Sequence, residues 1–424
     1  MRKLICLLGF LCLTALAPAA DKKAATNPQG SSYLFVWAGD EARKASDFLA
    51  VVDVNPSSPR YGRIVSRVAV GATALMPHHT EYEYPSDNHL FANGWAAGHT
   101  YVFDLSNPMK PRVSGQFTSR GGYSYPHSFV RLPNGHVLAT FQSHSAAYEA
   151  GGGLVEMDQD GVVVRSASAV DPAVSGDEIW PYSLAISPKL DVAVESMTPM
   201  PLPAWAKLPP GSWPLKKAEN QLTTHVQVWR ISDLKLLKTV ELPATEGKHN
   251  QWPAEPRLLS DGTVYVNTFS CGLYRMKDLD APEPSAEQVF TFPGFAGDIM
   301  TTCGVPVVVG HYWVQTVGGL PGLIVLDISN PEKPVEVSRL KLDGSRYPMV
   351  HWISADRKSD RVVITGDMES WILVAHLDPA TGKLSLDESF HAPGSKEPGI
   401  KFDAAALSQG HGGRALVHGT LFGQ

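Results

Sequence analysis

The residues best suited to chemistry begin with two adjacent histidines. His78 and His79 lie in the stretch MPHHTEYEY, residues 76–84, where acidic and aromatic residues alternate after the pair. This pattern is typical of a strand start that directs polar side chains into a shared cavity. Neutral imidazole nitrogen is a good ligand for copper, zinc, iron or nickel, so the pair is a candidate half of a transition-metal site.

The pair alone does not define such a site. Adjacent residues of an ideal strand point to opposite sides, so His78 or His79 is equally explained as an ordinary hydrogen-bonded histidine. The sequence contains no H-E-x-x-H metal motif, no G-x-S-x-G elbow, no phosphate-binding loop and no dinucleotide fingerprint. What else the fold brings to the two histidines therefore decides the chemistry.

The elements around the pair are short strands of alternating pattern, with no long helical periodicity, and they predict an all-β protein. They group into similar units, and three copies of one strand-end turn recur as VVDVNPSSPRY, VFDLSNPMKPR and VLDISNPEKPV. A repeat of about 40–45 residues is typical of four-stranded propeller blades. We expect a seven-bladed β-propeller, with six and eight as competing counts, built from units 33–70, 78–118, 128–168, 182–243, 253–293, 298–342 and 350–390.

The first unit lacks an inner strand of its own. We expect the C-terminal segment 413–421 to supply it and to close the ring by pairing with the N-terminal blade, because an open ring leaves unpaired sheet edges. A proline-rich insert at 197–220 interrupts the fourth unit, and its prolines exclude regular pairing. Trp205 and Trp213 favour an ordered cap over one channel mouth, with a flexible surface loop as the alternative.

Inner strands line the axial channel of a propeller, so polar residues at their starts converge. These starts hold His78 and His79, then PHS at 126–128, PYS at 181–183, WPAE at 252–255, GD at 297–298, PMVH at 348–351, and finally His418. The candidate metal ligands are His78, His79, His127 and His418. Glu255 and Asp298 are candidates for orienting ligands or moving protons, or they pin blades by hydrogen bonds. Glu81 and Tyr182 are candidates for shaping a substrate pocket.

The composition and the N-terminal residues bear on the partners of the protein and on its location. The 424 residues are 43% hydrophobic and 18% charged with a net charge of -6, and no basic run interleaves with aromatics, so we expect no nucleic-acid partner. Residues 1–20 have the pattern of a signal peptide, with a membrane anchor as the alternative, and we expect a single mature domain at 21–424 that is periplasmic or secreted. After cleavage, Cys271 and Cys303 remain, either as a disulfide or as two free thiols.

The chain resembles the selenium-binding protein and methanethiol oxidase family. The strongest match is DFLAVVDVNPSSPRYGRIV at 47–65, followed at the expected distance by the histidine pair. Further matches, in order, are YPHSFVRLPNGHVLAT, HVQVWRISDLKLLKTVEL, PAEPRLL, GDIM, GLIVLDISNPEKP, KEPGI and GRALVHG. The resemblance implies a seven-bladed propeller and a copper-dependent oxidation of a small thiol by dioxygen to aldehyde, sulfide and peroxide. The family's metal histidines fall on His78, His79, the His127 region and His418.

The chain also departs from the family pattern. The selenium-associated cysteine of the family is replaced by Gly62, and the second histidine and the cysteine of its P-H-x-x-H-C motif fall on Val130 and Arg131. The cysteine-rich segment after the paired histidines is absent as well. Two hypotheses follow. The chain is an exported, copper-dependent oxidase of small thiols, or it is a non-catalytic binding or scaffolding propeller that keeps the family fold without the chemistry.

Overall fold

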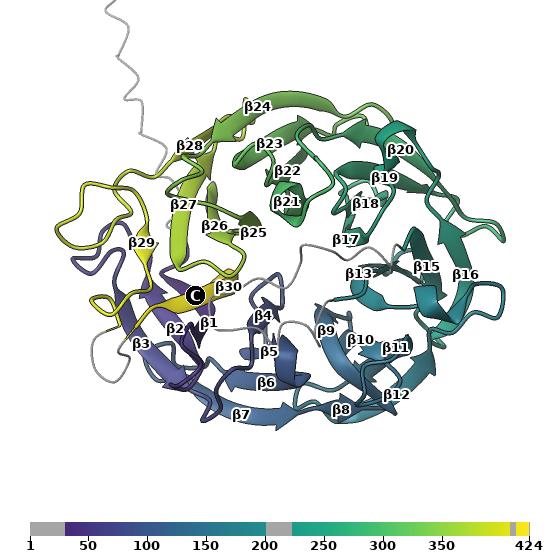
Figure 1. The fold of residues 1–424 in the computed structure, drawn as a ribbon, viewed down its shortest axis with the longest axis horizontal. Coiled ribbons are helices and arrows are strands. Elements are labelled where there is room, and N and C mark those ends of the chain that lie inside the picture. The colour runs from purple at the N-terminus through teal and green to yellow at the C-terminus, as the bar shows by residue number, and fades with distance from the viewer. Residues whose placement is uncertain (1–29, 201–222, 408–412, 424) are drawn as a thin grey trace, which may run out of the picture.

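The strands form a closed ring of seven antiparallel sheets around a central axis (Figure 1). The computed structural model describes residues 30–200, 223–407 and 413–423. Within these ranges five sheets have four strands and two have five. The fold is therefore a seven-bladed β-propeller, which confirms the predicted class and blade count. Helical structure in the described ranges is confined to short 3-10 turns, and no helix there is both long and apolar enough to cross a membrane.

Each blade runs from an inner strand at the axis to an outer strand at the rim. The first three blades contain β30 (Ala415–Gly423), β1 (Tyr33–Asp40), β2 (Phe48–Asp53) and β3 (Ile64–Ala69); β4 (Pro77–Thr80), β5 (His89–Gly94), β6 (His99–Asp104) and β7 (Arg112–Phe117); and β9 (Tyr123–Arg131), β10 (Val137–Ser143), β11 (Gly151–Met157) and β12 (Val163–Ser168), with β8 (Ser119–Arg120) beside β9.

The remaining four blades follow the same order along the chain. They contain β13 (Pro181–Ser187), β14 (Val192–Met197), β15 (His225–Arg230) and β16 (Lys235–Glu241); β17 (Pro253–Leu258), β18 (Val264–Thr268), β19 (Gly272–Lys277) and β20 (Ser285–Thr291); β21 (Cys303–Val309), β22 (Tyr312–Val317), β23 (Gly322–Asp327) and β24 (Val335–Lys341); and β25 (Val350–Ala355), β26 (Arg361–Gly366), β27 (Trp371–Leu377) and β28 (Leu384–Leu386), with β29 (Ile400–Lys401) paired to β27. The 3-10 turns are η1 (Trp95–Ala97), η2 (Gly176–Glu178), η3 (Glu246–Lys248) and η4 (Ile299–Thr301).

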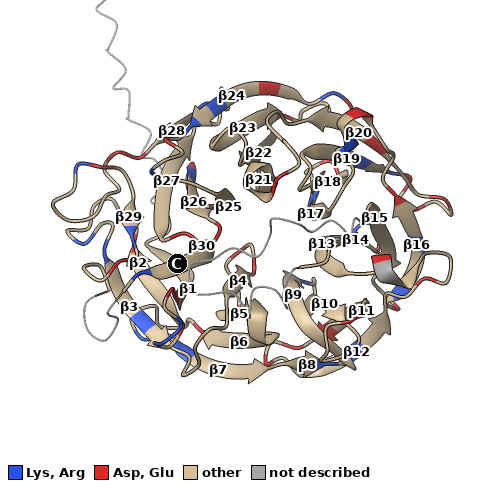
Figure 2. Cartoon of the chain, viewed as in Figure 1, with Lys and Arg blue, Asp and Glu red and all other residues tan. Residues whose placement is uncertain are grey.

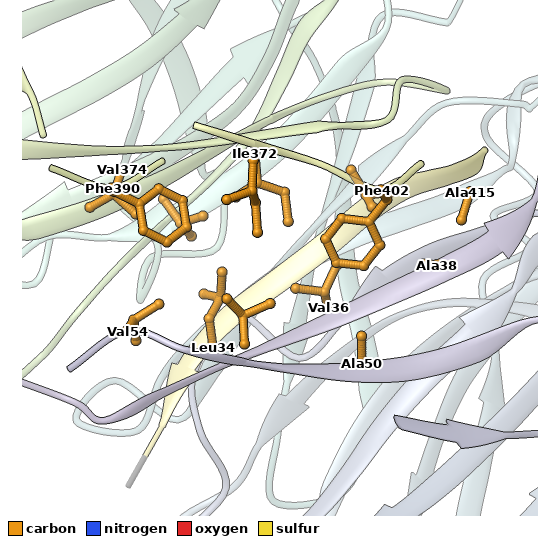
Figure 3. Packing of buried hydrophobic residues seen from close by; sticks show 14 of the residues in the cluster. Leu34, Val36, Ala38, Ala50, Val54, Ile372, Val374, Phe390, Phe402 and Ala415 are labelled. Atoms are coloured by element: carbon orange, nitrogen blue, oxygen red, sulfur yellow. The ribbon is translucent and has the colours of Figure 1, made fainter. Parts of the chain in front are cut away.

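The ring closes where the two ends of the chain share a sheet. β30 pairs antiparallel with β1, so that Tyr33 lies opposite Gly423 and Asp40 opposite Ala415. This pairing confirms the predicted closure. An apolar cluster between the first and seventh blades seals the joint, and Figure 3 shows part of it, with Leu34 facing Ile372 and Phe390. Burial of side chains of this size contributes about 1.5–3 kcal/mol each, so the closed ring is strongly favoured.

Burial separates the middle strands of a blade from its outer strand and explains their composition. β2 and β26 are buried along their whole lengths, and both are rich in β-branched residues that pack on either face. The outer strand β24 instead alternates between exposed and half-buried positions, because only one of its faces meets a neighbouring blade. Lys and Arg accordingly gather on outer strands such as β3 and β24 (Figure 2).

A disulfide joins the fifth blade to the sixth. Cys271 lies in the turn between β18 and β19, and its sulfur is 2.06 Å from that of Cys303 at the start of β21. Of the two alternatives for these cysteines, the structure shows the disulfide.

The sixth inner strand, β21, begins at Cys303. The prediction that this strand starts at Asp298 was therefore wrong. The predicted signal peptide at 1–20 and most of the insert at 197–220 lie outside the described residues.

Candidate metal centre

All seven inner strands lose regular pairing near their starts. In six blades two inner-strand residues oppose one residue of the next strand, and in the seventh blade His351 has no opposite residue. Such a β-bulge kinks the strand and re-aims its side chains. The bulged pairs are His78 and His79, His127 and Ser128, Tyr182 and Ser183, Ala254 and Glu255, Gly304 and Val305, and His418 and Gly419.

The bulge in β4 brings both adjacent histidines to the same place. Regular pairing is interrupted between Pro77 and Thr80, and the imidazole rings of His78 and His79 stack with their centroids 4.4 Å apart. The rule that neighbours on a strand face opposite sides does not hold across a bulge. The ideal-strand argument against joint metal binding is therefore wrong for this strand.

Five imidazole rings gather at the channel from four neighbouring blades. Ring centroids lie 4.1 Å apart for His78 and His418, 4.3 Å for His79 and His127, and 4.9 Å for His351 and His418. All five histidines are buried. In the described ranges their ligand atoms form two groups, each within 4.8 Å, namely His78 with His79 and His127, and His351 with Asp367 and His418.

Hydrogen bonds hold three of these rings by one nitrogen and leave the other unpaired. The Nδ1 atom of His127 lies 2.8 Å from the carbonyl oxygen of Tyr182, and that of His418 lies 3.0 Å from an oxygen of Asp367. The Nδ1 atom of His79 lies 3.1 Å from the Ser128 hydroxyl. The Nε2 atoms of the same histidines are buried without a partner. Metal-binding histidines are oriented in this way by a second-shell acceptor.

The electrostatics fit a cation at this position. Burial, reinforced by the neighbouring imidazoles, holds the pKa values of His78 and His79 well below their usual range, and burial does the same for His127. These rings are therefore neutral at pH 7, which is the form that binds metals. A buried imidazole nitrogen without a partner costs free energy, and a bound metal ion removes that cost.

A ring of polar residues on the second strands positions the bulges. Asn93 accepts from the backbone N–H of His79 at 2.7 Å and donates to the carbonyl of Pro126 in the next blade at 3.0 Å. Thr140 accepts from Ser128 N–H and donates to Tyr182 O, at 3.1 and 2.7 Å. Equivalent side chains at the following blade boundaries are Ser196, Asn267, Thr316 and Thr365. Six of the seven blades thus anchor the inner strand of the next blade at or beside its bulge.

Two of the predicted non-histidine residues lie against the histidines. One oxygen of Glu255, Oε1, is 3.9 Å from His79 Nε2 and has no hydrogen-bond partner. The other accepts from the Tyr82 and Ser183 hydroxyls and from Arg257, at 2.6, 2.7 and 2.9 Å. The Tyr182 ring centroid lies 3.9 Å from that of His127, and its hydroxyl is buried without a partner.

The structure does not bring Asp298 or Glu81 into the cluster. Asp298 is exposed and caps η4 by accepting from the N–H of Met300 at 2.9 Å, because the sixth inner strand begins only after this turn. Glu81 is buried, but its carboxylate accepts from Arg131 at 2.6 Å. Burial nevertheless raises the pKa of Glu81 to about 7.

Val130, the position of the family's second histidine, also points elsewhere. Its side chain packs against the apolar cluster between the third and fourth blades, which contains Leu138 and Leu184. A valine at this position therefore does not leave a gap among the five histidines.

Sequence reasoning did not select His351 or Asp367. A shared local pattern nevertheless marks His351, since a large residue precedes each of His78, His127 and His351 by two positions. These residues, Met76, Tyr125 and Met349, have φ values of 56°, 59° and 53°, a left-handed conformation rarely adopted by side chains of this size. Asp367 follows β26 and has no signal of this kind.

Large apolar side chains cover the histidine centre at one end. Trp95 is buried with its ring centroid 4.9 Å from that of His127, and it packs in one cluster with Met76, Tyr148 and Met368. A cavity of about 20 Å³ lies beside the centre, with Met76, Met368 and His418 among its lining residues. That volume suits a molecule of about the size of water. The charged residues Asp40, Glu41, Arg43 and Asp47 also line this narrow cavity, and of the five histidines only His418 lies at its wall.

The fold and the histidine centre define a β-propeller with a candidate transition-metal site. Residues 17–363 match the model of the 56 kDa selenium binding protein family, SBP56. Because this match covers most of the chain, the protein belongs to that family.

Similar proteins agree with this assignment. A methanethiol oxidase of Hyphomicrobium is 26% identical over 336 residues, which cover 75% of this chain and 72% of that protein. The mouse methanethiol oxidase is 22% identical over 339 residues, covering 71% and 67% of the two chains. A hypothetical selenium-binding protein from Sulfolobus tokodaii shares the fold, with a TM-score of 0.69, 18% identity and coverage of 92% and 93%.

Proposed function

We propose that the protein is an exported, copper-dependent oxidase of small thiols. The observation that carries the proposal is the group of five buried imidazoles, of which His79, His127, His351 and His418 present an unpaired Nε2 atom. The similarity to methanethiol oxidases supports thiol as the substrate class. In the proposed reaction a thiol, dioxygen and water give an aldehyde, hydrogen sulfide and hydrogen peroxide, which balances for methanethiol and formaldehyde.

The residues in place fit a bound copper ion. His78, His79 and His127 would hold it, with His418 beside them, through the nitrogens that have no partner in the protein. Copper, when bound there, binds a soft thiolate and exchanges single electrons with dioxygen. Asp367, Ser128 and the carbonyl of Tyr182 keep the rings in the required orientation.

Glu255 is the proposed proton acceptor for the substrate thiol. Its Oε2 atom is fixed by three donors, which stabilise the negative charge, while Oε1 remains unpaired beside His79. The guanidinium of Arg257 also lies 4.0 Å from the centre of the Tyr82 ring, so the side chains around the carboxylate are packed in place. A positioned carboxylate of this kind typically accelerates proton transfer by about 10²–10⁴-fold.

The apolar cover accounts for the proposed preference for small substrates. Met76 and Met368 pack with Trp95 in one apolar cluster, and both methionines line a narrow cavity next to His418. A short alkyl thiol matches this apolar cluster because its one polar atom is the sulfur that would reach the metal. Tyr182, whose hydroxyl has no protein partner, is the residue proposed to contact the substrate from the fourth blade.

The proposal also includes export. The charged and apolar pattern of residues 1–20 supports a signal peptide, and the disulfide between Cys271 and Cys303 is the kind of bond that persists in an oxidising compartment. Cell fractionation of the tagged full-length chain tests it. Recovery of a shortened chain outside the cytoplasm supports export, and a full-length chain confined to the cytoplasm excludes it.

A non-catalytic binding propeller is the second candidate. Its support is Arg131, which stands where the family has a cysteine and instead forms ion pairs with Glu81 and Asp87 at 2.6 Å each. At this position the chain has a structural link between the second and third blades in place of a thiol. If the replaced cysteine is required for chemistry, the fold persists without turnover.

Methanethiol and dioxygen consumption by copper-loaded protein separates the two candidates. We expect the native chain to consume both and to release sulfide, and His79→Asn to abolish consumption. His311→Asn is the matched control, because His311 is exposed in the turn between β21 and β22. A folded, copper-loaded native chain that leaves methanethiol unconsumed would exclude the oxidase.

A further inference from the structure

We propose that the centre holds two metal ions, the second bound by His351, Asp367 and His418. This inference rests on the same histidine cluster as the proposed function but not on thiol oxidation. One ligand atom from each of the three residues lies within 4.8 Å of the other two. A tetrahedral ion at about 2.1 Å from its ligands separates them by about 3.4 Å, so small side-chain rotations complete the site.

The second group is separate from the first in the fold. His351 comes from the seventh blade, Asp367 follows β26 of the same blade, and His418 comes from the C-terminal strand β30. The first group, His78, His79 and His127, comes from the second and third blades. The two groups meet where the His78 and His418 rings lie 4.1 Å apart.

The number of unpaired donors argues for two ions rather than one. His79, His127, His351 and His418 each have a buried Nε2 atom without a partner, and His78 has a buried Nδ1 atom without one. A single tetrahedral ion accepts four ligands, and a catalytic ion keeps only about three so that one position stays open. One such ion therefore leaves two of these nitrogens buried and unpaired. Two ions with three protein ligands each use one nitrogen from every one of the five rings and keep open positions.

The carboxylate gives the second group the charge that a divalent ion needs. Asp367 is 6% exposed, and its backbone N–H donates to the carbonyl of Met349 at 2.8 Å, which fixes the start of its side chain. Two imidazoles and one carboxylate form a ligand set typical of zinc and also suitable for copper(II). The first group consists of imidazoles alone. The two positions therefore differ in charge, and the second favours a divalent ion.

The sixth blade is shaped to admit His351. A Cβ atom added at Gly304 would lie 2.8 Å from His351 Nδ1 and 2.5 Å from its carbonyl oxygen. Only glycine leaves room for the imidazole at this place. Thr316 then fixes the backbone by donating to the His351 carbonyl at 3.0 Å. The fold thus supplies His351 with both space and support.

Metal stoichiometry tests the inference with copper(II) as the probe. Full-length folded protein is loaded with copper(II), freed of loosely bound ions, and analysed for metal per chain by mass spectrometry. We expect two ions in the native chain and one in His351→Asn and in Asp367→Asn, with His311→Asn as the control that keeps two. Magnetic coupling between the paired copper(II) ions should reduce the electron paramagnetic resonance signal of the native chain, and His351→Asn should restore an isolated signal.

One copper per native chain, or two ions that persist in His351→Asn, would overturn the inference. If circular dichroism shows that His351→Asn does not fold, His351→Gln is tested in its place under the same criteria. The result is also distinguishable from the proposed function. If the native chain binds one ion and oxidises methanethiol, the second metal site is wrong and the proposed oxidase stands. If it binds two ions and leaves methanethiol unconsumed, the second site stands and the oxidase is wrong.

Discussion

Replacing Thr140 by valine tests whether the polar ring on the second strands positions the metal centre. Thr140→Val keeps the shape of the side chain and removes only its hydroxyl. That hydroxyl accepts from the Ser128 N–H at 3.1 Å and donates to the Tyr182 carbonyl at 2.7 Å, so it connects the bulges of two blades. The same carbonyl orients the ring of His127. The substitution should therefore affect both stability and metal binding.

The magnitude follows from the two lost hydrogen bonds. The Ser128 N–H is left buried without its acceptor, which costs about 1–3 kcal/mol. The Tyr182 carbonyl loses its bond from Thr140 but keeps its bond to His127, so the loss of the Thr140 bond adds about 1 kcal/mol. The free energy of unfolding should fall by about 2–4 kcal/mol. Loss of a second-shell contact typically weakens metal binding by about 10–100-fold, and we expect the lower end of that range because His127 keeps its direct partner.

Urea unfolding followed by tryptophan fluorescence measures the first effect, and competition with a copper chelator measures the second. Thr100→Val is the matched control, because Thr100 is equally buried but its hydroxyl has no hydrogen-bond partner. The control should be as stable as the native chain or more stable. Equal unfolding free energies for Thr140→Val and Thr100→Val, with unchanged copper affinity, would refute the role of the ring.

Three further variants test other parts of the structure. Glu255→Gln should keep its metal content but lower the rate of methanethiol consumption by about 10²-fold, since a positioned proton acceptor is lost; an unchanged rate would remove Glu255 from the mechanism. The double variant Cys271→Ser with Cys303→Ser should lose about 3–4 kcal/mol of unfolding free energy, because the disulfide closes a segment of 32 residues; an unchanged thermal midpoint would contradict this. Burial raises the pKa of Glu195 to about 8 from an ordinary value of 4.5, so the folded chain retains a proton that the unfolded chain releases and stability falls as pH rises between these values. Glu195→Gln should therefore be more stable than the native chain by about 3 kcal/mol at pH 7 and differ least near pH 4.5; a constant difference across that range would exclude this explanation.

The fold was predictable because each blade repeats its own local signals. The strand-end turns in three units and the spacing of alternating strands sufficed for seven blades, and the C-terminal strand was needed to complete the first. The start of the sixth inner strand was misplaced at Asp298. Glycine and aspartate there resemble a strand start, but the residues form a capped 3-10 turn and Cys303 begins the strand.

The site was only partly predictable because bulges are not visible in an alternating pattern. His127 and His418 were selected by their place at inner-strand starts, and the structure brings both to the pair. The joint inward position of His78 and His79 depends on the extra residue opposite Asn93, which period-two reasoning does not contain. Asp367 follows a second strand rather than an inner one, so its contact with His418 required the three-dimensional arrangement.

Anomalous diffraction from crystals of the copper-loaded protein tests the central claim most directly. Data collected at the copper absorption edge locate the metal independently of any assumption about its ligands. The structure predicts a peak within about 2.0–2.2 Å of the free nitrogens of His78, His79 and His127. Anomalous peaks found only beside surface side chains, with no peak beside the buried histidines, would contradict a metal centre formed by these histidines.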